Sequence, residues 1–492
     1  MVNISKSLYC NYVQCKKMVW LLKNKMEEYV ETKNEQVLDN GNKVGDLARR
    51  YFGNYSLVKY DEVLINMIMD TKKLLKDGKE IICEASFKFN NLFASIDVLK
   101  IEDDGVSIYE VKSSSEIKDI YKDDASFQAY ILKKLGYKIK SVNIMHVNSN
   151  YVLGKEFDIK EFFTVEDITD ISILKENEIE EYVKEMNEVL DSNKEPNIDI
   201  DKQCFSPYPC PFFKYCTKHL PEKNVFDING KFIRLNDKLK LYHEGNYSYE
   251  TLINSVTNEK ALDQIDFVLN NKKPKINVEK IKEFMSKLKY PLYFLDYETC
   301  QFVIPEIEGT RPYQQLTFQY SLHILDKEDG ELIHKEFLAD VNDKDFIRHF
   351  AESLIKDIPG DGSVIIYNKS FEPTRNKEIA RMYPEFKEDL EKINSNMIDF
   401  MIPFYEHWYY TKEMEGSYSI KYVLPALYRD DPSLDYHNLD LIHNGGEASS
   451  SFIDMIDKSE EEVLKIRKAL LKYCELDTYA MVKIYEKLKE IE

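Results

Sequence analysis

Three cysteines at equal intervals constrain this chain more than any other feature of its sequence. Cys204, Cys210 and Cys216 lie among prolines and aromatic residues in the segment CFSPYPCPFFKYC. Thiolates spaced in this way are typical of metal ligands, but a structural zinc site and an iron–sulfur cluster each normally take four ligands. The sequence therefore predicts that a fourth ligand comes from elsewhere in the chain.

The composition indicates a multidomain globular protein of the cytoplasm. The chain has 492 residues, enough for about three domains of ordinary size. No stretch approaches the roughly 20 apolar residues of a membrane span, and the N-terminal segment has neither the apolar region nor the cleavage site of a signal peptide. Eight cysteines are too few for a disulfide scaffold in a chain of this length. Because disulfides are rare in the cytoplasm, clustered cysteines favour a metal or an iron–sulfur cluster.

The pattern of apolar residues divides the chain into three parts. Residues 78–114 alternate apolar and polar positions around the turn EDDG, which predicts antiparallel strands. Residues 226–285 have the pattern of a helical connector, and after it apolar strands such as YFLDYET and GSVIIYN are followed by helices. The sequence predicts an α/β multidomain fold with domains over 1–225, 226–285 and 286–492.

A first set of charged residues lies on the predicted strands of the N-terminal part. Asp97 falls in the apolar strand LFASIDVL, and Glu110 and Lys112 follow in YEVK. The alternation of side chains along a strand places Glu110 and Lys112 on one face. Carboxylates that hold Mg²⁺ or Mn²⁺ beside a lysine are the combination that phosphodiester hydrolysis needs. An ordinary salt bridge on a hairpin is the competing interpretation.

These residues and the cysteines together resemble the RecB-type PD-(D/E)xK nucleases, in particular the cluster-bearing branch that includes the CRISPR adaptation nucleases. In that branch a cysteine near the N-terminus, here in CKKMVWL, joins three that follow the nuclease core. The resemblance implies a restriction-endonuclease-like core in which Asp97 and Glu110 bind metal. It also implies that Gln128, on the next helix, helps to place Lys112 or the substrate.

The same resemblance makes Cys15 the fourth ligand of a [4Fe–4S] cluster with Cys204, Cys210 and Cys216. On one continuous helix Cys10 and Cys15 would point about 140° apart, so only one of them should face the cluster. Zinc is the alternative, but structural zinc usually takes pairs of cysteines two to four residues apart. We expect the cluster to staple the two ends of the nuclease domain without a redox role.

Two residues depart from the family pattern. Lys16 replaces the proline after the first cysteine, and Arg49 in GDLAR stands where many relatives carry a histidine. The second departure argues against a histidine metal ligand at the first site and predicts a reduced or altered activity there.

A second set of carboxylates occupies the C-terminal part. Asp296 and Glu298 share one face of the strand YFLDYET, and Glu372 follows the buried strand VIIYN. Tyr473 and Asp477, four residues apart in YCELD, share one face of a helix. Two Mg²⁺ or Mn²⁺ ions about 4 Å apart need several shared carboxylates to stabilise the attacking and leaving oxygens of a phosphodiester.

In this order the residues resemble the D-x-E, N-x-x-F-D and Y-x-x-x-D motifs of the DnaQ-like 3′–5′ exonucleases of the DEDDy class. The resemblance implies an RNase H-like fold, metal binding by the four acids, and orientation of the attacking water by Tyr473. Glu372 stands where the family has an aspartate, and Asp399 in NMIDF is an alternative acid.

The two resemblances together point to a bacterial family that joins a RecB-like cluster domain to a DnaQ-like domain. We expect a metal-dependent nuclease that trims nucleic-acid ends, DNA in preference to RNA, in repair or defence. The net charge of −20 argues against a general positive field for nucleic acid, but an exonuclease can grip a single strand within its channel. Two alternatives stay open: a nucleic-acid-binding module with an inactive first domain, and a structural cluster protein that scaffolds a repair or defence complex.

Overall fold

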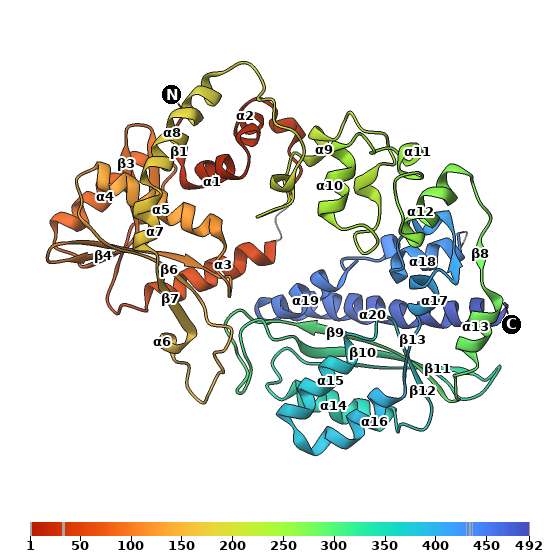
Figure 1. Cartoon of the computed structure of the whole chain (residues 1–492). Helices are drawn as coiled ribbons and strands as arrows, with labels where there is room; N and C mark the ends of the chain where they lie inside the picture. Colours follow the sequence, from red (N-terminus) through yellow and green to blue (C-terminus); the bar gives the residue numbers. More distant parts are fainter. Residues whose placement is uncertain (1, 32–34, 430, 432–433, 435, 492) are drawn as a thin grey trace. The chain divides into compact units, whose positions relative to one another are not determined.

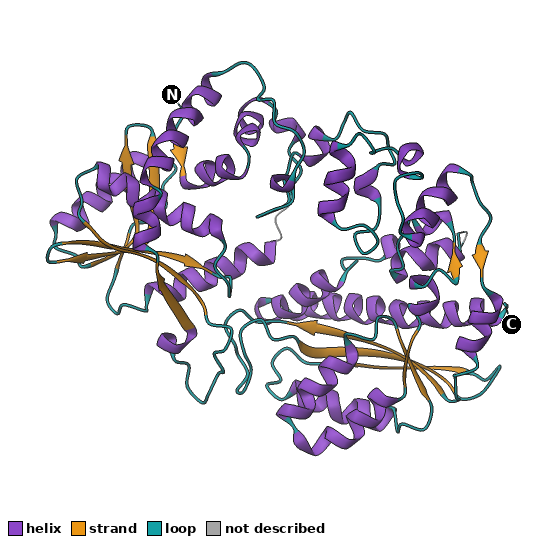
Figure 2. Cartoon of the chain, in the orientation of Figure 1, coloured by secondary structure: helices purple, strands orange, loops and turns teal. Residues whose placement is uncertain are grey.

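The computed structural model describes residues 2–31, 35–429, 431, 434 and 436–491. The chain divides into two compact units, each with its own sheet of mixed strand direction (Figures 1 and 2). The first unit comprises Met1–His219 and Phe302–Tyr313, and the second comprises Leu220–Gln301 and Gln314–Glu492. The expectation of a mixed α/β protein is therefore confirmed, whereas the division into three domains stays a prediction.

The first unit is built on a seven-stranded sheet. Its strands β3, β4 and β5 are successive antiparallel neighbours, as the alternation over 78–114 predicts. β6 runs parallel to β5, so the chain must cross over between them. The strands of the sheet are β2 (Ser56–Leu57), β3 (Ile81–Phe89), β4 (Leu92–Glu102), β5 (Gly105–Lys112), β6 (Ile139–Val147) and β7 (Phe163–Asp167) in spatial order, with β1 (Ile4–Ser5) beside β4.

The crossover between β5 and β6 is the helix α5 (Asp119–Lys134), which is buried along most of its length. Gly136 ends it with a φ of +91°, a left-handed conformation that glycine adopts without strain. The ring of Phe127 in α5 stacks on Tyr9 in α1 with centroids 4.5 Å apart. The other α-helices of this unit are α1 (Lys6–Gln14), α2 (Lys16–Asn24), α3 (Glu35–Arg49), α4 (Leu64–Lys76), α6 (Ile159–Phe162), α7 (Thr169–Leu174), α8 (Glu176–Asp191) and α9 (Phe213–Cys216).

The segment around Cys15 differs from the sequence expectation. The continuous helix that we assumed for Cys10 and Cys15 breaks at Cys15, whose extended backbone (φ −159°, ψ 115°) separates α1 from α2. The angle of about 140° expected from helical geometry therefore does not apply. Cys10 instead packs against the core of the first unit.

The second unit is built on a five-stranded sheet. β9, β10 and β11 are antiparallel neighbours, whereas β12 and β13 run parallel to β9. A Cβ atom at Gly362 would lie 1.9 Å from the carbonyl oxygen of Pro291, so glycine is required where β12 begins beside β9. The strands in spatial order are β11 (Leu332–Leu338), β10 (Leu316–Leu325), β9 (Leu292–Cys300), β12 (Ser363–Ile366) and β13 (Met397–Asp399).

One long helix, α20 (Glu460–Lys489), covers one face of this sheet and contacts β9 and β10, while α14 (Phe346–Asp357), α15 (Glu372–Met382) and α16 (Lys387–Ser395) lie on the other side (Figure 1). A capping box between Ser459 and Glu462 starts α20, which stabilises its first turn by satisfying free backbone N–H groups.

Shorter elements complete the second unit. Two helices flank Gly245, as the pattern in the connector predicts. In the part of the chain that the structure describes, no helix is long and apolar enough to cross a membrane. The remaining elements are α10 (Leu235–His243), α11 (Tyr249–Leu252), α12 (Glu259–Leu269), β8 (Lys275–Ile276), α13 (Val278–Met285), α17 (Ile402–Tyr405), β14 (Tyr409–Tyr410), α18 (Ile420–Leu427) and α19 (Gly445–Asp454).

Candidate functional site

Three carboxylates converge where β9 meets α20. Asp296 and Glu298 extend from the same face of β9, and Asp477 points toward them from α20. One oxygen of each residue lies within 4.8 Å of an oxygen of the other two. The three acids that the sequence predicts as metal ligands thus lie together, although their segments are almost 180 residues apart in the chain. Strand alternation and helix packing bring them to one place.

Burial opposes ionisation of these three acids, and repulsion by Asp477 adds to this effect at Asp296 and Glu298. Burial, followed by the charges of Asp477 and Glu298, raises the pKa of Asp296 well above its usual value. Burial and Asp477 do the same to the pKa of Glu298. Burial raises the pKa of Asp477 to about 6, against the opposing effects of a tyrosine hydrogen bond and of Lys421. Like charges held this close are stable in their ionised form only beside a cation.

Glu372 lies close enough to act on the cluster electrostatically. It begins α15, directly after the turn that follows β12, and only 1% of its surface is exposed. Its charge contributes to the raised pKa values of Asp296 and Glu298, and burial raises its own pKa to about 8. Its Oε2 atom is buried without a hydrogen-bond partner. A buried carboxylate oxygen without a hydrogen-bond partner, near three other acids, is suited to bind a cation.

Two residues that the sequence did not single out hold Asp477. The hydroxyl of Tyr436 donates to Oδ1 of Asp477 over 2.7 Å. Lys421 in α18 lies over the rings of both Tyr436 and Tyr473, 5.3 and 5.5 Å from their centroids, and its charge lowers the pKa of Asp477 and of Glu298. Lys421 falls in the segment SYSIKYVLPAL, which resembles the one before the last DnaQ-like motif, but no local pattern marks Tyr436.

Tyr473 lies where the sequence predicts it. A hydrogen bond with Tyr473 helps to lower the pKa of Asp477, and the tyrosine ring lies 6.3 Å from that of Tyr436. Burial, followed by the charges of Asp477 and Glu298, raises the pKa of the Tyr473 hydroxyl, so this group stays protonated and can donate. Cys474, the next residue, lies with its sulfur 3.9 Å from Oδ2 of Asp296.

Asp399, the alternative acid, has a different role. Its carboxylate accepts hydrogen bonds from the backbone N–H groups of Asn368, Lys369 and Met401, each over 2.9 Å. Asn368 has a φ of +80°, and the bonds from Asn368 and Lys369 hold the turn that leads from β12 toward Glu372. Asp399 therefore positions the backbone beside the carboxylate cluster.

In the first unit, the RecB-like residues also lie together. Lys112 donates to Oε1 of Glu110 over 2.6 Å, and Gln128 donates to Oε2 of the same carboxylate over 2.6 Å. Asp97 accepts a hydrogen bond of 2.7 Å from the backbone N–H of Val111, between the two motif residues. The four residues that the sequence predicts for this site are thus in contact through one hydrogen-bond network.

A residue that the sequence analysis missed occupies the centre of this network. The ammonium group of Lys6, at the start of α1, lies 3.3 Å from Oδ1 of Asp97 and 3.2 Å from both carboxylate oxygens of Glu110. Burial opposes its charge, but Asp97 and Glu110 outweigh that effect and raise the pKa of Lys6 well above its usual value. Lys6 thus contacts both predicted metal ligands directly, so a divalent ion would have to displace it.

The charge of Lys112, the second lysine of the site, is also balanced by carboxylates. Lys112 contacts Asp124 of α5 over 2.8 Å in addition to Glu110. Burial and Asp97 oppose ionisation of Glu110, yet Lys112, Lys6 and the Gln128 amide together hold its pKa below the usual value. This carboxylate is charged and balanced by residues of its own chain.

Arg49, which stands in the place of the family histidine, lies at the edge of the same region. It contacts Glu84 over 3.3 Å and Asp46 over 2.6 Å. Glu84 has a φ of +56° and sits where the pairing of β3 with β4 is interrupted. Burial and the charge of Asp97 raise the pKa of Glu84. Arg49 therefore fixes an additional carboxylate near Asp97 and has no lone pair for a metal.

The four predicted cluster cysteines lie close enough to affect one another's pKa. Burial comes first in raising the pKa of Cys204 to about 12 and that of Cys210 to about 11, and the charge of Cys15 adds to both effects. Burial is also the main cause of the raised pKa of Cys216. The charge of Lys17 opposes this increase, and the charge of Cys15 adds to it. Gln14, beside Cys15, donates to the backbone oxygens of residues 203 and 208 over 2.8 and 2.7 Å, which ties the N-terminal segment to the cysteine loop.

Four cysteine thiolates are a donor set that suits both a structural zinc ion and a [4Fe–4S] cluster. The [4Fe–4S] cluster on Cys15, Cys204, Cys210 and Cys216 stays a prediction.

The chain has distant relatives. Residues 293–419, which include Asp296, Glu298 and Glu372, match the model of a domain of unknown function, DUF2779. Uncharacterized protein MG366 of Mycoplasma genitalium is 25% identical over 425 residues, which cover 75% of this chain and 62% of that protein. The Uncharacterized protein MG366 homolog of Mycoplasma pneumoniae is 26% identical over 294 residues, 53% of this chain and 43% of that protein. The chain spans less than two thirds of these relatives, and no solved structure matches it significantly.

Proposed function

We propose that the protein is a metal-dependent nuclease and that its second unit is a 3′–5′ exonuclease of the DnaQ-like, DEDDy type. The observation that carries this proposal is the convergence of Asp296, Glu298 and Asp477 within 4.8 Å. Burial raises the pKa of all three acids, and the charge of Asp477 adds to this effect at Asp296 and Glu298. Carboxylates clustered in this way are suited to bind divalent ions. The antiparallel half and parallel half of the sheet, with the acid-bearing β9 at its centre, agree with an RNase H-like fold.

The residues have distinct roles in this proposal. Asp296, Glu298 and Asp477 hold Mg²⁺ or Mn²⁺, and the buried oxygen of Glu372 completes the set. The bound ions supply a hydroxide nucleophile and stabilise the charge that develops on the phosphodiester. The Tyr473 hydroxyl would donate a hydrogen bond to the attacking water and so orient it, which agrees with its raised pKa and its place next to Asp477.

Lys421 and Tyr436 have supporting roles at this site. The Lys421 charge and the 2.7 Å hydrogen bond from Tyr436 offset part of the repulsion around Asp477 before the ions bind. Asp399 holds the turn before Glu372 through the backbone N–H groups of Asn368 and Lys369. We infer that these residues preorganise the ligands and do not touch the ions.

For the first unit we propose a PD-(D/E)xK fold that presents nucleic acid to the exonuclease and is stapled by a [4Fe–4S] cluster on Cys15, Cys204, Cys210 and Cys216. The contact of Lys6 with both Asp97 and Glu110 favours a binding role over cleavage, because the position of a metal is taken by an ammonium group. The substrate is nucleic acid, DNA in preference to RNA, and the setting is repair or defence.

The experiment is a degradation assay with the full chain. Single- and double-stranded DNA and RNA, labelled at the 5′ end, are incubated with Mg²⁺, with Mn²⁺ or with EDTA. We expect single-nucleotide shortening from the 3′ end that needs a divalent ion. Asp296→Asn should lower the rate by several orders of magnitude, whereas Tyr473→Phe should lower it by about 10²-fold or less, since an orienting group contributes less than a metal ligand.

The matched control is Glu461→Gln, because Glu461 is an exposed acid on α20 that forms an ion pair with Lys465. This variant should keep the wild-type rate. If Asp296→Asn shortens 3′ ends as fast as the wild type, the exonuclease proposal is wrong. If the wild type degrades nothing but binds single strands, the binding-module alternative takes its place.

A further inference from the structure

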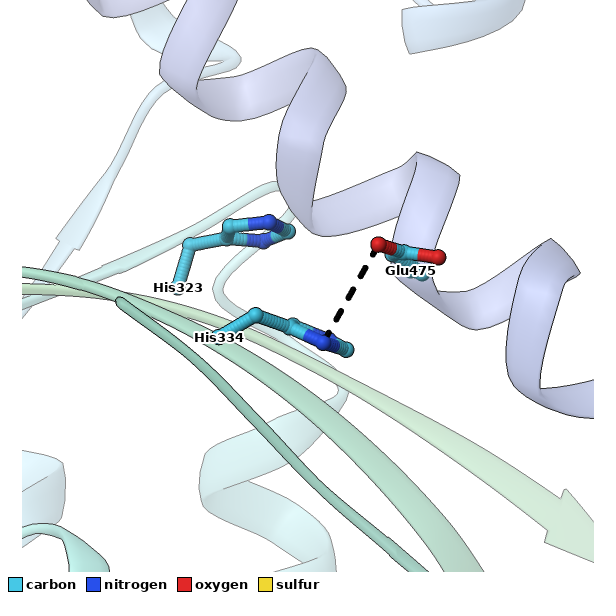
Figure 3. Close-up of side chains that lie close together, drawn as sticks. All are labelled: His323, His334 and Glu475. Carbon is cyan, nitrogen blue, oxygen red and sulfur yellow. Dashed lines mark ion pairs between the residues drawn. The ribbon is translucent and has the colours of Figure 1, made fainter. Parts of the chain in front are cut away.

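A second group of metal-ligating side chains lies on the sheet of the second unit, apart from the four acids. His323 on β10 and His334 on β11 are directly opposite each other in the antiparallel register, and Glu475 reaches them from α20. One potential ligand atom of each residue lies within 4.8 Å of those of the other two. Figure 3 shows the three side chains pointing toward one another, with the ion pair of 4.0 Å between Nδ1 of His334 and Oε1 of Glu475.

This group is distinct from the proposed exonuclease site. Glu475 precedes Asp477 by two positions on α20, so the two side chains project in directions that differ by about 160° around the helix. The two sites nevertheless share β10 and α20. Ser321, two residues before His323, is opposite Asp296 in the sheet.

The hydrogen bonds around the two histidines determine which ring nitrogens carry protons. Thr478 donates to the backbone oxygen of Glu475 over 3.0 Å, since that oxygen can only accept. The Thr478 hydroxyl must then accept from its other two partners, Nδ1 of His323 at 2.8 Å and the hydroxyl of Ser321 at 2.7 Å. Ser321 has used its proton, so it accepts from Nε2 of His334 over 2.9 Å.

This assignment leaves a lone pair on Nε2 of His323 and on Nδ1 of His334. In metal sites a ligating histidine usually donates its second ring N–H to a neighbouring polar group, which fixes the tautomer and the ring orientation. Here Thr478 and Ser321 supply those partners for both rings. His323 is also kept neutral, because burial and then the neighbouring His334 lower its pKa to about 4.

We propose that His323, His334 and Glu475 form a binding site for a late transition-metal ion, with Zn²⁺ as the best match. Two imidazoles and one carboxylate form a known set of zinc ligands that leaves a fourth position for water. With metal–ligand bonds of about 2.1 Å, tetrahedral ligands lie about 3.4 Å apart. The site must therefore contract from 4.8 Å or less, and Glu475, whose side chain is 50% exposed, is free to turn inward.

The site would join three elements of the second unit. β11 is an edge strand of the sheet, and the metal would tie it to β10 and to α20, the helix that carries Tyr473 and Asp477. Zinc binding should therefore stabilise the second unit. It would also restrain α20 without contacting the substrate.

The test measures zinc retained by the full chain. Chelator-treated protein is dialysed against limiting free Zn²⁺ in the presence of excess Mg²⁺, and the bound zinc is counted by mass spectrometry. The wild type should keep one more zinc ion per chain than Glu475→Gln or His334→Gln. Any zinc held by the cysteines is the same in all these proteins and cancels in the comparison. Thr478→Val keeps all three ligands but should weaken the zinc affinity about 10–100-fold, as loss of an orienting partner does.

Two controls make the result decisive. His349→Gln removes an exposed histidine that pairs with Asp343 over 2.6 Å and that, among the residues the structure describes, belongs to no group of three metal-ligating side chains; it should keep the full zinc content. Asp296→Asn should also keep it, because the exonuclease acids are not part of this site. Circular dichroism checks that each variant is folded. Equal zinc in the wild type and in folded Glu475→Gln would overturn the proposal. Loss of the additional zinc in Asp296→Asn, with the zinc retained in Glu475→Gln, would overturn it as well.

Discussion

The buried acids of the second unit should make the metal-free protein less stable than a variant with fewer of them. We predict that Asp477→Asn stabilises the second unit in EDTA at pH 8. The amide keeps an oxygen that can accept the 2.7 Å hydrogen bond from Tyr436, so the substitution mainly removes a charge from the cluster. It also removes the repulsion with Asp296 and Glu298.

The magnitude follows from the pKa of Asp477. Burial raises it from 3.8 to about 6, and a difference of about 2 in pKa corresponds to about 3 kcal/mol. Direct repulsion gives the same order, because two unit charges 4.8 Å apart in an effective dielectric of about 20 repel by about 3.5 kcal/mol. For a unit of this size, 3 kcal/mol corresponds to about 6–12 °C in Tm.

The pH dependence has a defined sign. Because the pKa is higher in the folded chain, the native state holds the Asp477 proton more tightly than the unfolded chain does between about pH 4 and pH 6. Stability therefore falls as the pH rises through this window, and the loss is complete above it. The advantage of Asp477→Asn should be largest at pH 8 and should vanish near pH 4.

The assay is thermal unfolding followed by tryptophan fluorescence. The chain has two tryptophans, and Trp20→Phe leaves Trp408 in the second unit as the only reporter. Excess Mg²⁺ in place of EDTA should raise the Tm of the parent protein. The difference in Tm between Asp477→Asn and the parent should then shrink or change sign. The reasoning is refuted if Asp477→Asn has no higher Tm than the parent in EDTA at pH 8, or if its advantage is the same at pH 4.

Two further predictions concern the first unit. In an Asp296→Asn background, Lys6→Met should create Mn²⁺ binding at Asp97, because it removes the ammonium group that contacts Asp97 and Glu110. Electron paramagnetic resonance measures the bound Mn²⁺. Unchanged Mn²⁺ binding would contradict the proposal that Lys6 occupies the position of a metal. Anaerobically purified protein should absorb near 400 nm and carry about four irons per chain. Cys15→Ser should lose the iron and Cys10→Ser should keep it, whereas colourless protein with one zinc at the cysteines would exclude the cluster.

Most of the strands and the grouping of acids follow from local patterns. The alternation in YFLDYET suffices to place Asp296 and Glu298 on one face, and the spacing of four residues places Tyr473 and Asp477 together on a helix. These features depend only on the periods of strands and helices, which the sequence displays directly.

The residues that were missed act over long separations in the chain. Lys6 lies 91 and 104 residues from its partners Asp97 and Glu110, and Tyr436 lies 41 residues from Asp477. No periodicity relates such positions, so only the packed fold reveals these contacts. The break at Cys15 escaped prediction for a related reason: the surrounding residues favour helix, and the local helical pattern gives no sign of the extended residue between α1 and α2.

The balance of charge assigns different roles to the two sites. In the first unit, Lys6 and Lys112 make direct contacts with three carboxylates, so internal ammonium groups compensate most of the negative charge. In the second unit, the charge of Lys421 lowers the pKa of Glu298 and Asp477, but its ammonium group donates a hydrogen bond to the backbone oxygen of residue 443.

An uncompensated cluster of buried acids costs stability that a bound divalent ion recovers, whereas a compensated one gains little from the ion. We therefore expect metal binding, and the phosphodiester cleavage that needs Mg²⁺ or Mn²⁺, to reside in the second unit. Removing one acid from each unit separates the two contributions: Asp97→Asn should leave the metal requirement of cleavage unchanged, and a loss of cleavage equal to that of Asp296→Asn would contradict this assignment.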